Sequence, residues 1–82
     1  MDEPDNPLGT VTLDGASYQI SPTAFRSVYQ VMTEDGKLLG LIETMETEGG
    51  RKFMARPATG AGMTQSTMMR IAEAAAASGI MK

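Results

Sequence analysis

Few residues in this 82-residue sequence have side chains that commonly carry out catalysis. The chain has no histidine and no cysteine, so it lacks the usual acid–base group at neutral pH and the usual thiolate nucleophile or metal ligand. Serine, threonine and lysine remain as possible nucleophiles and bases, but no serine stands in the Gly-x-Ser-x-Gly pattern of a strained nucleophile elbow. We therefore expect a protein that is not an enzyme and that uses no cofactor.

Two other patterns could attract ions. The stretch 59–64, TGAGMT, precedes a predicted helix, where backbone N–H groups attract anions, but it lacks the lysine of a P-loop and the third glycine of a dinucleotide fingerprint. A flexible connection is the favoured interpretation. The carboxylates have no calcium-loop spacing and are expected to be solvated charges. They are Asp2, Glu3, Asp5, Glu34, Asp35, Glu43, Glu46 and Glu48. No metal site and no small-molecule substrate is expected.

The stretch 28–56 contains most of the branched and aromatic apolar residues, together with two turn signals. The pairs Asp35-Gly36 and Gly49-Gly50 fall between apolar runs, and such pairs supply the positive φ that tight hairpin turns require. We predict three antiparallel strands over residues 27–33, 37–46 and 51–56. The rest of the chain must pack on this meander.

A shorter hairpin precedes the meander. Apolar and polar residues alternate on both sides of the Asp14-Gly15 turn signal, which predicts strands over 10–13 and 16–20. An isolated hairpin is marginal in water, so this one must lie on the meander or extend its edge. Residues 1–8 are acidic and contain two prolines, so we expect a disordered tail, followed by a single small domain over residues 9–82.

The segment after this hairpin allows an alternative. Ser21-Pro22 could begin a helix instead of preceding a strand. One face of that helix would contain Phe25, Val28, Tyr29 and Met32. The strand is favoured, because residues 28–33 are rich in β-forming residues and lead directly into the turn at Asp35-Gly36.

Pairing the strands assigns their side chains to two faces. With Gly36 in the left-handed position of a three-residue loop, Val31 lies opposite Leu39 and Met32 opposite Leu38, and Tyr29 faces Leu41. Folding about Gly49-Gly50 sets Met45 opposite Met54 and Glu43 opposite Arg56. One face then contains Tyr29, Val31, Leu39, Leu41, Met45 and Met54, and the other contains Val28, Met32, Leu38, Gly40, Ile42, Phe53 and Ala55. Both faces are apolar, so two covers are required.

A C-terminal helix over residues 65–78 is the first cover. Thr64 or Ser66 can cap its start, and Gly79 followed by Ile80 predicts a Schellman motif at its end. Its apolar face consists of Met68, Ile71, Ala72 and Ala75. The alanines allow close approach at Gly40, so we place the helix on the Gly40 face. The second cover would be the first hairpin, a second copy of the chain, or another protein.

The basic residues Arg51, Lys52 and Arg56 lie on or beside the third strand of the meander. Three strands followed by a helix resemble, in topology only, the DNA-reading sheets of AP2-like and integrase arm-binding domains. The resemblance implies DNA binding through these three residues. No sequence motif of those families is matched, and nearby glutamates dilute the positive charge of the candidate face.

Composition limits the remaining classes. Seven basic and ten acidic residues give a formal charge of −3, which does not favour nucleic acid as the partner. The start of the chain has neither a basic nor an apolar signal region, and no run is long enough to span a membrane. We expect a cytoplasmic location.

The sequence as a whole predicts an α+β fold, an antiparallel β-meander of three main strands plus a short N-terminal hairpin, packed against one C-terminal α-helix. We expect a non-catalytic accessory or regulatory domain of bacterial or phage type, which binds another protein or itself through an apolar sheet face. The predicted partner-binding residues are Tyr29, Val31, Leu39, Leu41, Met45 and Met54. Eight methionines suit such an adaptable surface. DNA binding through the sheet is the alternative.

Overall fold

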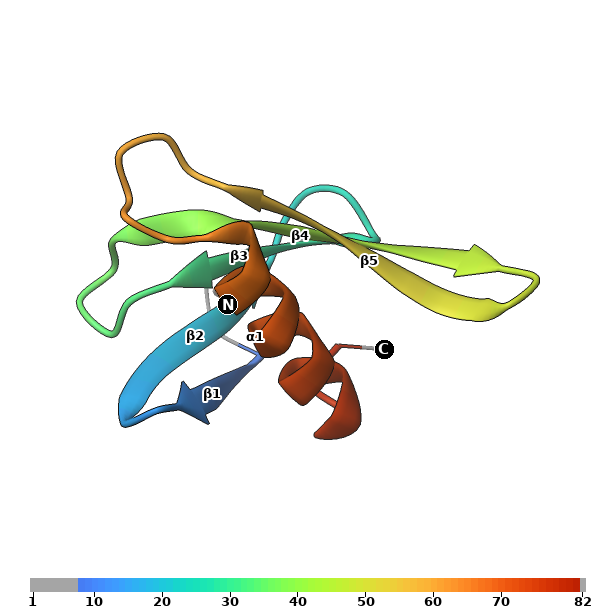
Figure 1. Ribbon diagram of the computed structural model, residues 1–82, viewed down its shortest axis with the longest axis horizontal. Coiled ribbons are helices and arrows are strands. Elements are labelled where there is room, and N and C mark those ends of the chain that lie inside the picture. The colour runs from blue at the N-terminus through green and yellow to red at the C-terminus, as the bar shows by residue number, and fades with distance from the viewer. Residues whose placement is uncertain (1–7, 82) are drawn as a thin grey trace, which may run out of the picture.

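A computed structural model describes residues 8–81 (Figure 1). The chain forms one antiparallel sheet, in which five strands follow one another in sequence order, and ends in one helix. The elements are β1 (Gly9–Leu13), β2 (Ala16–Pro22), β3 (Val28–Met32), β4 (Leu38–Thr47), β5 (Gly50–Pro57) and α1 (Gln65–Ala77). The predicted α+β meander is confirmed, and each predicted element is shifted by at most two residues at either end. The predicted tail lies outside the described residues except for Leu8.

The short N-terminal hairpin extends the meander. Strand β2 pairs with β3 from Gln19–Met32 to Pro22–Tyr29, so β1 and β2 continue the same sheet. The helical alternative at Ser21-Pro22 is wrong, because β2 runs through Pro22 and a loop over residues 23–27 precedes β3. This hairpin therefore cannot cover the second face of the sheet, and one of the three candidate covers is removed.

The turn between β3 and β4 matches its prediction. Gly36 has a φ of 96°, its N–H donates to the carbonyl of Thr33 at 3.0 Å, and Thr33 N–H donates to Lys37 O at 2.9 Å. These bonds close a three-residue loop, and the next pair, Met32 opposite Leu38, is also as predicted. A positive φ that favours glycine thus starts the hairpin in the expected register.

A β-bulge then changes the register. Val31 lies opposite Gly40 instead of Leu39, and Leu39 is the extra residue, buried at 6% exposure. Beyond the bulge Tyr29 pairs with Ile42, so the predicted pairs in this part of β3 are wrong by one residue. A shift of one residue exchanges the two faces of a strand.

The second hairpin closes earlier than predicted. Thr47 lies opposite Gly50 with Glu48 and Gly49 as the loop, and the Thr47 hydroxyl donates to Gly50 O at 2.6 Å. Met45 therefore faces Lys52 instead of Met54. The predicted register is wrong by two residues, but an even shift leaves each side chain on its predicted face.

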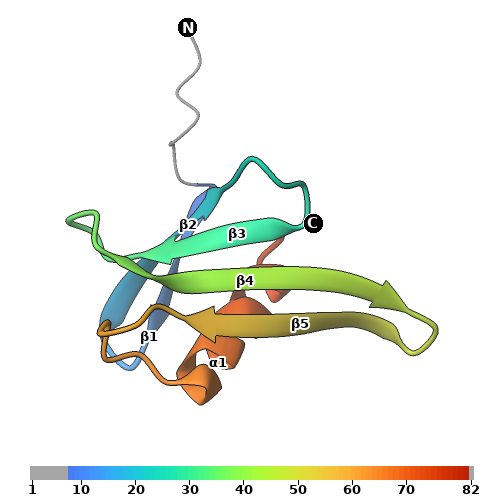
Figure 2. The same ribbon diagram turned by 90° about the horizontal axis from the view of Figure 1, so that it is seen from above.

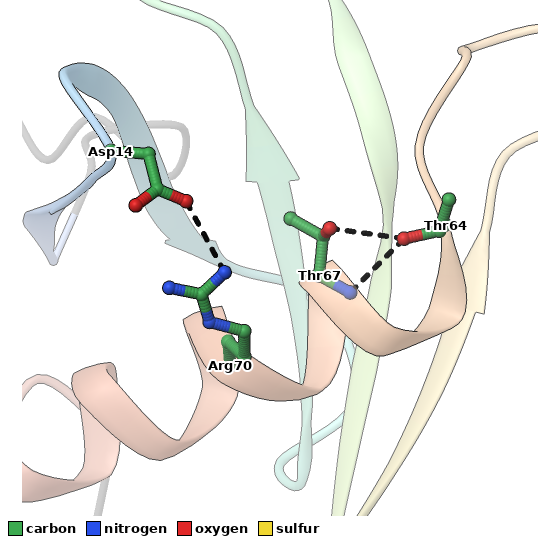
Figure 3. A network of polar contacts seen from close by, with 4 residues as sticks. All are labelled: Asp14, Thr64, Thr67 and Arg70. Atoms are coloured by element: carbon green, nitrogen blue, oxygen red, sulfur yellow. Dashed lines mark hydrogen bonds and ion pairs between the residues drawn. The ribbon is translucent and has the colours of Figure 1, made fainter.

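The ends of α1 follow from local sequence. Thr64 caps the first turn by accepting from Thr67 N–H at 3.1 Å (Figure 3). At the other end Ile80 N–H donates to Ala75 O at 2.9 Å and Gly79 N–H to Ala76 O at 3.1 Å, which is the predicted Schellman motif. Arg70 on the solvent side of the helix pairs with Asp14 in the β1–β2 turn at 3.2 Å.

One face of the sheet and α1 enclose the core. The helix contacts mainly β5 and β1, the two edge strands, and also β4, so it lies across the hollow of the curled sheet (Figure 1). Its predicted apolar face is confirmed, since Met68, Ile71, Ala72 and Ala75 are all buried. The sheet supplies Val11, Ile20, Tyr29, Val31, Leu39, Ile42 and Ala55.

Gly40 lies on the helix side of β4, in contact with the end of the Met68 side chain. A Cβ atom at this position would stand 2.6 Å from Met68 Cε and 2.7 Å from the carbonyl oxygen of Arg56. No side chain fits there without displacing backbone. The helix lies on the Gly40 face as predicted, but Met68 and not an alanine contacts the glycine.

Candidate binding surface

The candidate surface is the side of β3, β4 and β5 that faces away from α1, which we call the open face. Successive residues of a strand point to opposite sides, so its members alternate with the core residues Tyr29, Val31, Ile42 and Ala55. They are Val28, Gln30 and Met32 on β3, Leu38, Leu41, Glu43 and Met45 on β4, and Lys52, Met54 and Arg56 on β5. In Figure 2, β4 and β5 pass in front of the helix.

Large apolar side chains on this face reach solvent. Met45 and Met54 are each 37% exposed and Leu38 is 40% exposed, while Val28, Met32 and Leu41 are half-buried. The β1–β2 part of the same side is polar, with Thr10, Thr12, Ser17, Gln19 and Ser21 in these positions. The apolar surface is therefore confined to the meander and has a polar border.

The charges on the open face have both signs. Glu43 lies opposite Met54, and the neighbouring positions of β5 on this side are Lys52 and Arg56. None of the three forms an ion pair among residues 8–81, where the ion pairs are Arg51–Glu46 and Arg70–Asp14. The Arg56 guanidinium instead lies 3.2 Å from the Met54 sulfur. The three charges are available to another molecule.

The predicted partner-binding residues divide into two groups. Leu41, Met45 and Met54 lie on the open face, as expected. Tyr29, Val31 and Leu39 are buried in the core beneath the helix, at 9%, 0% and 6% exposure, so their placement on the open face is wrong. The bulge at Leu39 is the cause, because it changes the phase of β3 relative to β4.

The open face also has members that the sequence did not assign to it. Val28, Met32 and Leu38 were expected beneath the helix and lie on the opposite side. The bulge is again the reason that these residues were assigned to the wrong face. Apart from Gly40, the sequence contains no signal for the bulge. The predicted DNA-binding residues divide similarly, because Lys52 and Arg56 lie on the open face and Arg51 lies on the helix side, 3.2 Å from Glu46.

A second exposed apolar feature lies in the β2–β3 loop. Phe25 is 72% exposed, the highest value among the large apolar side chains of residues 8–81. The loop is nevertheless ordered by hydrogen bonds: Thr23 Oγ1 donates to Val28 O at 2.8 Å, and Val28 N–H donates to Phe25 O at 3.2 Å. Thr44 N–H donates to Ser27 O at 2.8 Å and joins the loop to β4 beside the open face. The fold thus presents an aromatic ring to solvent on a hydrogen-bonded loop.

The described residues offer little other chemistry. They contain no group of three or more acidic side chains that could hold a metal ion and no detectable cavity, and none of their helices could span a membrane. The Thr33 hydroxyl, which donates to the carboxylate of Asp35, lowers the pKa of that exposed group below its ordinary value. This bond stabilises the β3–β4 turn and is not near any candidate nucleophile.

No protein-family model, no curated protein and no solved structure matches this chain.

Proposed function

We propose that this domain is a non-catalytic binding module that associates through its open face, and that a second copy of the chain occupies this face. One observation supports the proposal above the others. The single helix covers one side of the sheet and the N-terminal hairpin lies within the sheet, so Leu41, Met45 and Met54 have no cover among residues 8–81. Exposed apolar groups with a polar border are typical of protein interaction surfaces.

The charges favour a second copy as the occupant. An isologous two-fold contact sets the same surface against itself, so Glu43 of one copy can meet Lys52 or Arg56 of the other. A face of one sign would repel its own copy. The methionines are suited to such a contact because their flexible thioethers adapt to a neighbouring surface.

The size of the domain is compatible with this assembly. A standard interface buries about 800 Å² per partner. That area is roughly 15% of the 5326 Å² accessible surface of the domain, compared with about 10% for a typical small protein.

Sedimentation equilibrium over a range from roughly 10 µM to 1 mM tests the proposal. We expect the average mass of the wild-type chain to rise with concentration. Leu41→Glu should remain monomeric and folded, because the carboxylate returns to water in the monomer and would be buried unpaired in the assembly. Thr12→Glu is the matched control, since Thr12 is exposed on the same side of the sheet at β1, and it should associate like the wild type.

A wild-type chain that stays monomeric over the whole range would refute the association. Should Leu41→Glu fail to fold, Met54→Glu replaces it, because Met54 is already 37% exposed.

DNA binding through the same face is a second candidate, supported by Lys52 and Arg56, which project from β5 without a carboxylate partner among residues 8–81. A duplex-DNA mobility shift that weakens steeply with salt, and that is lost in the Lys52→Ala, Arg56→Ala double variant, would support it. A concentration-dependent mass without any shift would support the first proposal.

A further inference from the structure

The free edge of β5 presents backbone groups that the open-face association does not use. Strand β5 is the last strand of the sheet. The hydrogen bond from Ala58 N–H to Leu39 O, at 2.9 Å, shows which residues of β5 direct their backbone groups toward β4. In an antiparallel ladder alternate residues exchange bonds with the neighbouring strand. Residues 52, 54 and 56 therefore bond to β4, and the backbone groups of Arg51, Phe53 and Ala55 point outward.

Only the second half of this edge is occupied. Gln65 Nε2 donates to the carbonyl of Ala55 at 3.3 Å, which agrees with this carbonyl pointing away from β4. Pro57 ends the strand. The outward groups of Arg51 and Phe53 form no hydrogen bond with residues 8–81. Unpaired N–H and C=O groups at a sheet edge are a template for another strand.

This part of the edge is also accessible. The β4–β5 hairpin projects beyond α1 and the other strands in both views (Figures 1 and 2). Every residue from Met45 to Lys52 is exposed. A segment that pairs along β5 as far as Lys52 would therefore meet neither the helix nor the other strands.

The side chains of β5 select the occupant. The strand contains Arg51, Lys52 and Arg56 and no acidic residue. Pairing of β5 with β5 of a second copy would place like charges side by side, which is unfavourable. An incoming strand with acidic side chains would instead be attracted to the basic side chains of β5.

The two sides of β5 favour different side chains on an incoming strand. Lys52 and Arg56 point to the open face, whereas Phe53 points to the helix side, where it is half-buried against the core. A strand added along the unoccupied half of β5 would put an acidic side chain next to Lys52 and an apolar side chain next to the Phe53 ring.

We propose that β5 accepts, as a sixth strand, an extended segment of a partner protein in which acidic residues alternate with apolar ones. Backbone bonds to Arg51 and Phe53 supply the affinity, and Lys52 and Phe53 supply the preference for that pattern. The backbone edge of β5 takes no part in the open-face contact, although Lys52 belongs to both, so protection of the Arg51 and Phe53 amides is the measurement that separates the two proposals.

The probe is an end-capped seven-residue peptide of alternating glutamate and valine, titrated into the full chain and followed by amide NMR. A matched peptide of alternating lysine and valine is the control. We expect the acidic peptide to shift the amides of Arg51 and Phe53 and to slow their hydrogen exchange. Open-face binding would not protect these two N–H groups, which distinguishes the two sites.

Two variants separate the contributions. Lys52→Glu should weaken the acidic peptide on the order of fivefold and strengthen the basic one, because exposed charge pairs contribute modestly. Arg51→Pro removes an outward N–H and should abolish the added strand, whereas Arg51→Ala, which keeps the N–H, should retain most of the binding.

Equal binding of the two peptides, shifts confined to the open face, or no protection of Arg51 and Phe53 at millimolar peptide would each overturn the proposal. Should Arg51→Pro unfold the hairpin, the Lys52→Glu result still decides, because Lys52 is exposed and its substitution leaves the ladder intact.

Discussion

Over β3, β4 and β5 the two faces of the sheet contain nearly the same number of apolar residues, yet only one of them is a core. Rows across the strands show the difference. On the helix side Tyr29, Ile42 and Ala55 form one row, all nearly inaccessible to solvent. On the open face each row across β4 and β5 includes a charged residue, as where Met45 lies opposite Lys52. Apolar residues that are interleaved with charges form an interface-like surface instead of an interior.

The largest difference in unfolding free energy is expected between substitutions at two adjacent residues of β4 that lie on opposite faces of the sheet. Ile42→Ala removes a fully buried side chain and should destabilise the domain by about 3 kcal/mol, since the close-packed core cannot collapse around the cavity. Leu41→Ala, one residue away on the half-buried open face, should cost about 1 kcal/mol or less. Urea denaturation of dilute protein measures both. Similar losses in the two variants would show that the open face is part of the core.

Substitution of Gly40 tests how tightly β4 packs against Met68 of the helix and the backbone of β5. Gly40→Ala should cost about 1–3 kcal/mol, because the new methyl group meets the backbone oxygen of Arg56 as well as the mobile end of Met68. Gly49→Ala is the matched control in the β4–β5 turn, where a Cβ has only Thr47 Oγ1 nearby, at 3.9 Å. A Gly40→Ala protein as stable as the control would contradict the close approach.

Substitutions of Gly36 test the β3–β4 turn, which sets the register in which these two strands begin to pair. Gly36→Val should destabilise by about 1–2 kcal/mol through backbone strain alone, since a Cβ here has no neighbour within 4 Å but φ is 96°. Gly36→Asn should cost less, because asparagine tolerates positive φ better than a β-branched residue. Equal urea midpoints for all three proteins would show that the turn does not require this conformation.

The smallest effect is expected at the exposed methionine of β5. Met54→Ser should change the unfolding free energy of the monomer by no more than about 0.5 kcal/mol, as for other surface positions. The same variant should weaken self-association in sedimentation. A large loss of stability in dilute solution would place Met54 in the core and remove the contrast between the faces.

Local sequence alone determined the elements and their ends. Positive φ at Gly36, the Thr64 cap and the Schellman motif at Gly79 each depend on residues a few positions apart, so the strands and the helix could be predicted within two residues. The placement of the helix on the Gly40 face was also predictable, although Met68 makes the contact in place of the predicted alanines.

Only the tertiary structure decided which face each residue occupies. One bulged residue, Leu39, moved Tyr29 and Val31 from the predicted binding surface into the core, and moved Val28 and Met32 out of it. The side-chain period of a strand is two, so a shift of one residue reverses every assignment beyond it. The bulge is stabilised by the burial of Leu39 and by the contact of Met68 with Gly40, and these contacts join residues far apart in the chain. Local propensity does not include such contacts, which is why the strands were predictable and their facing was not.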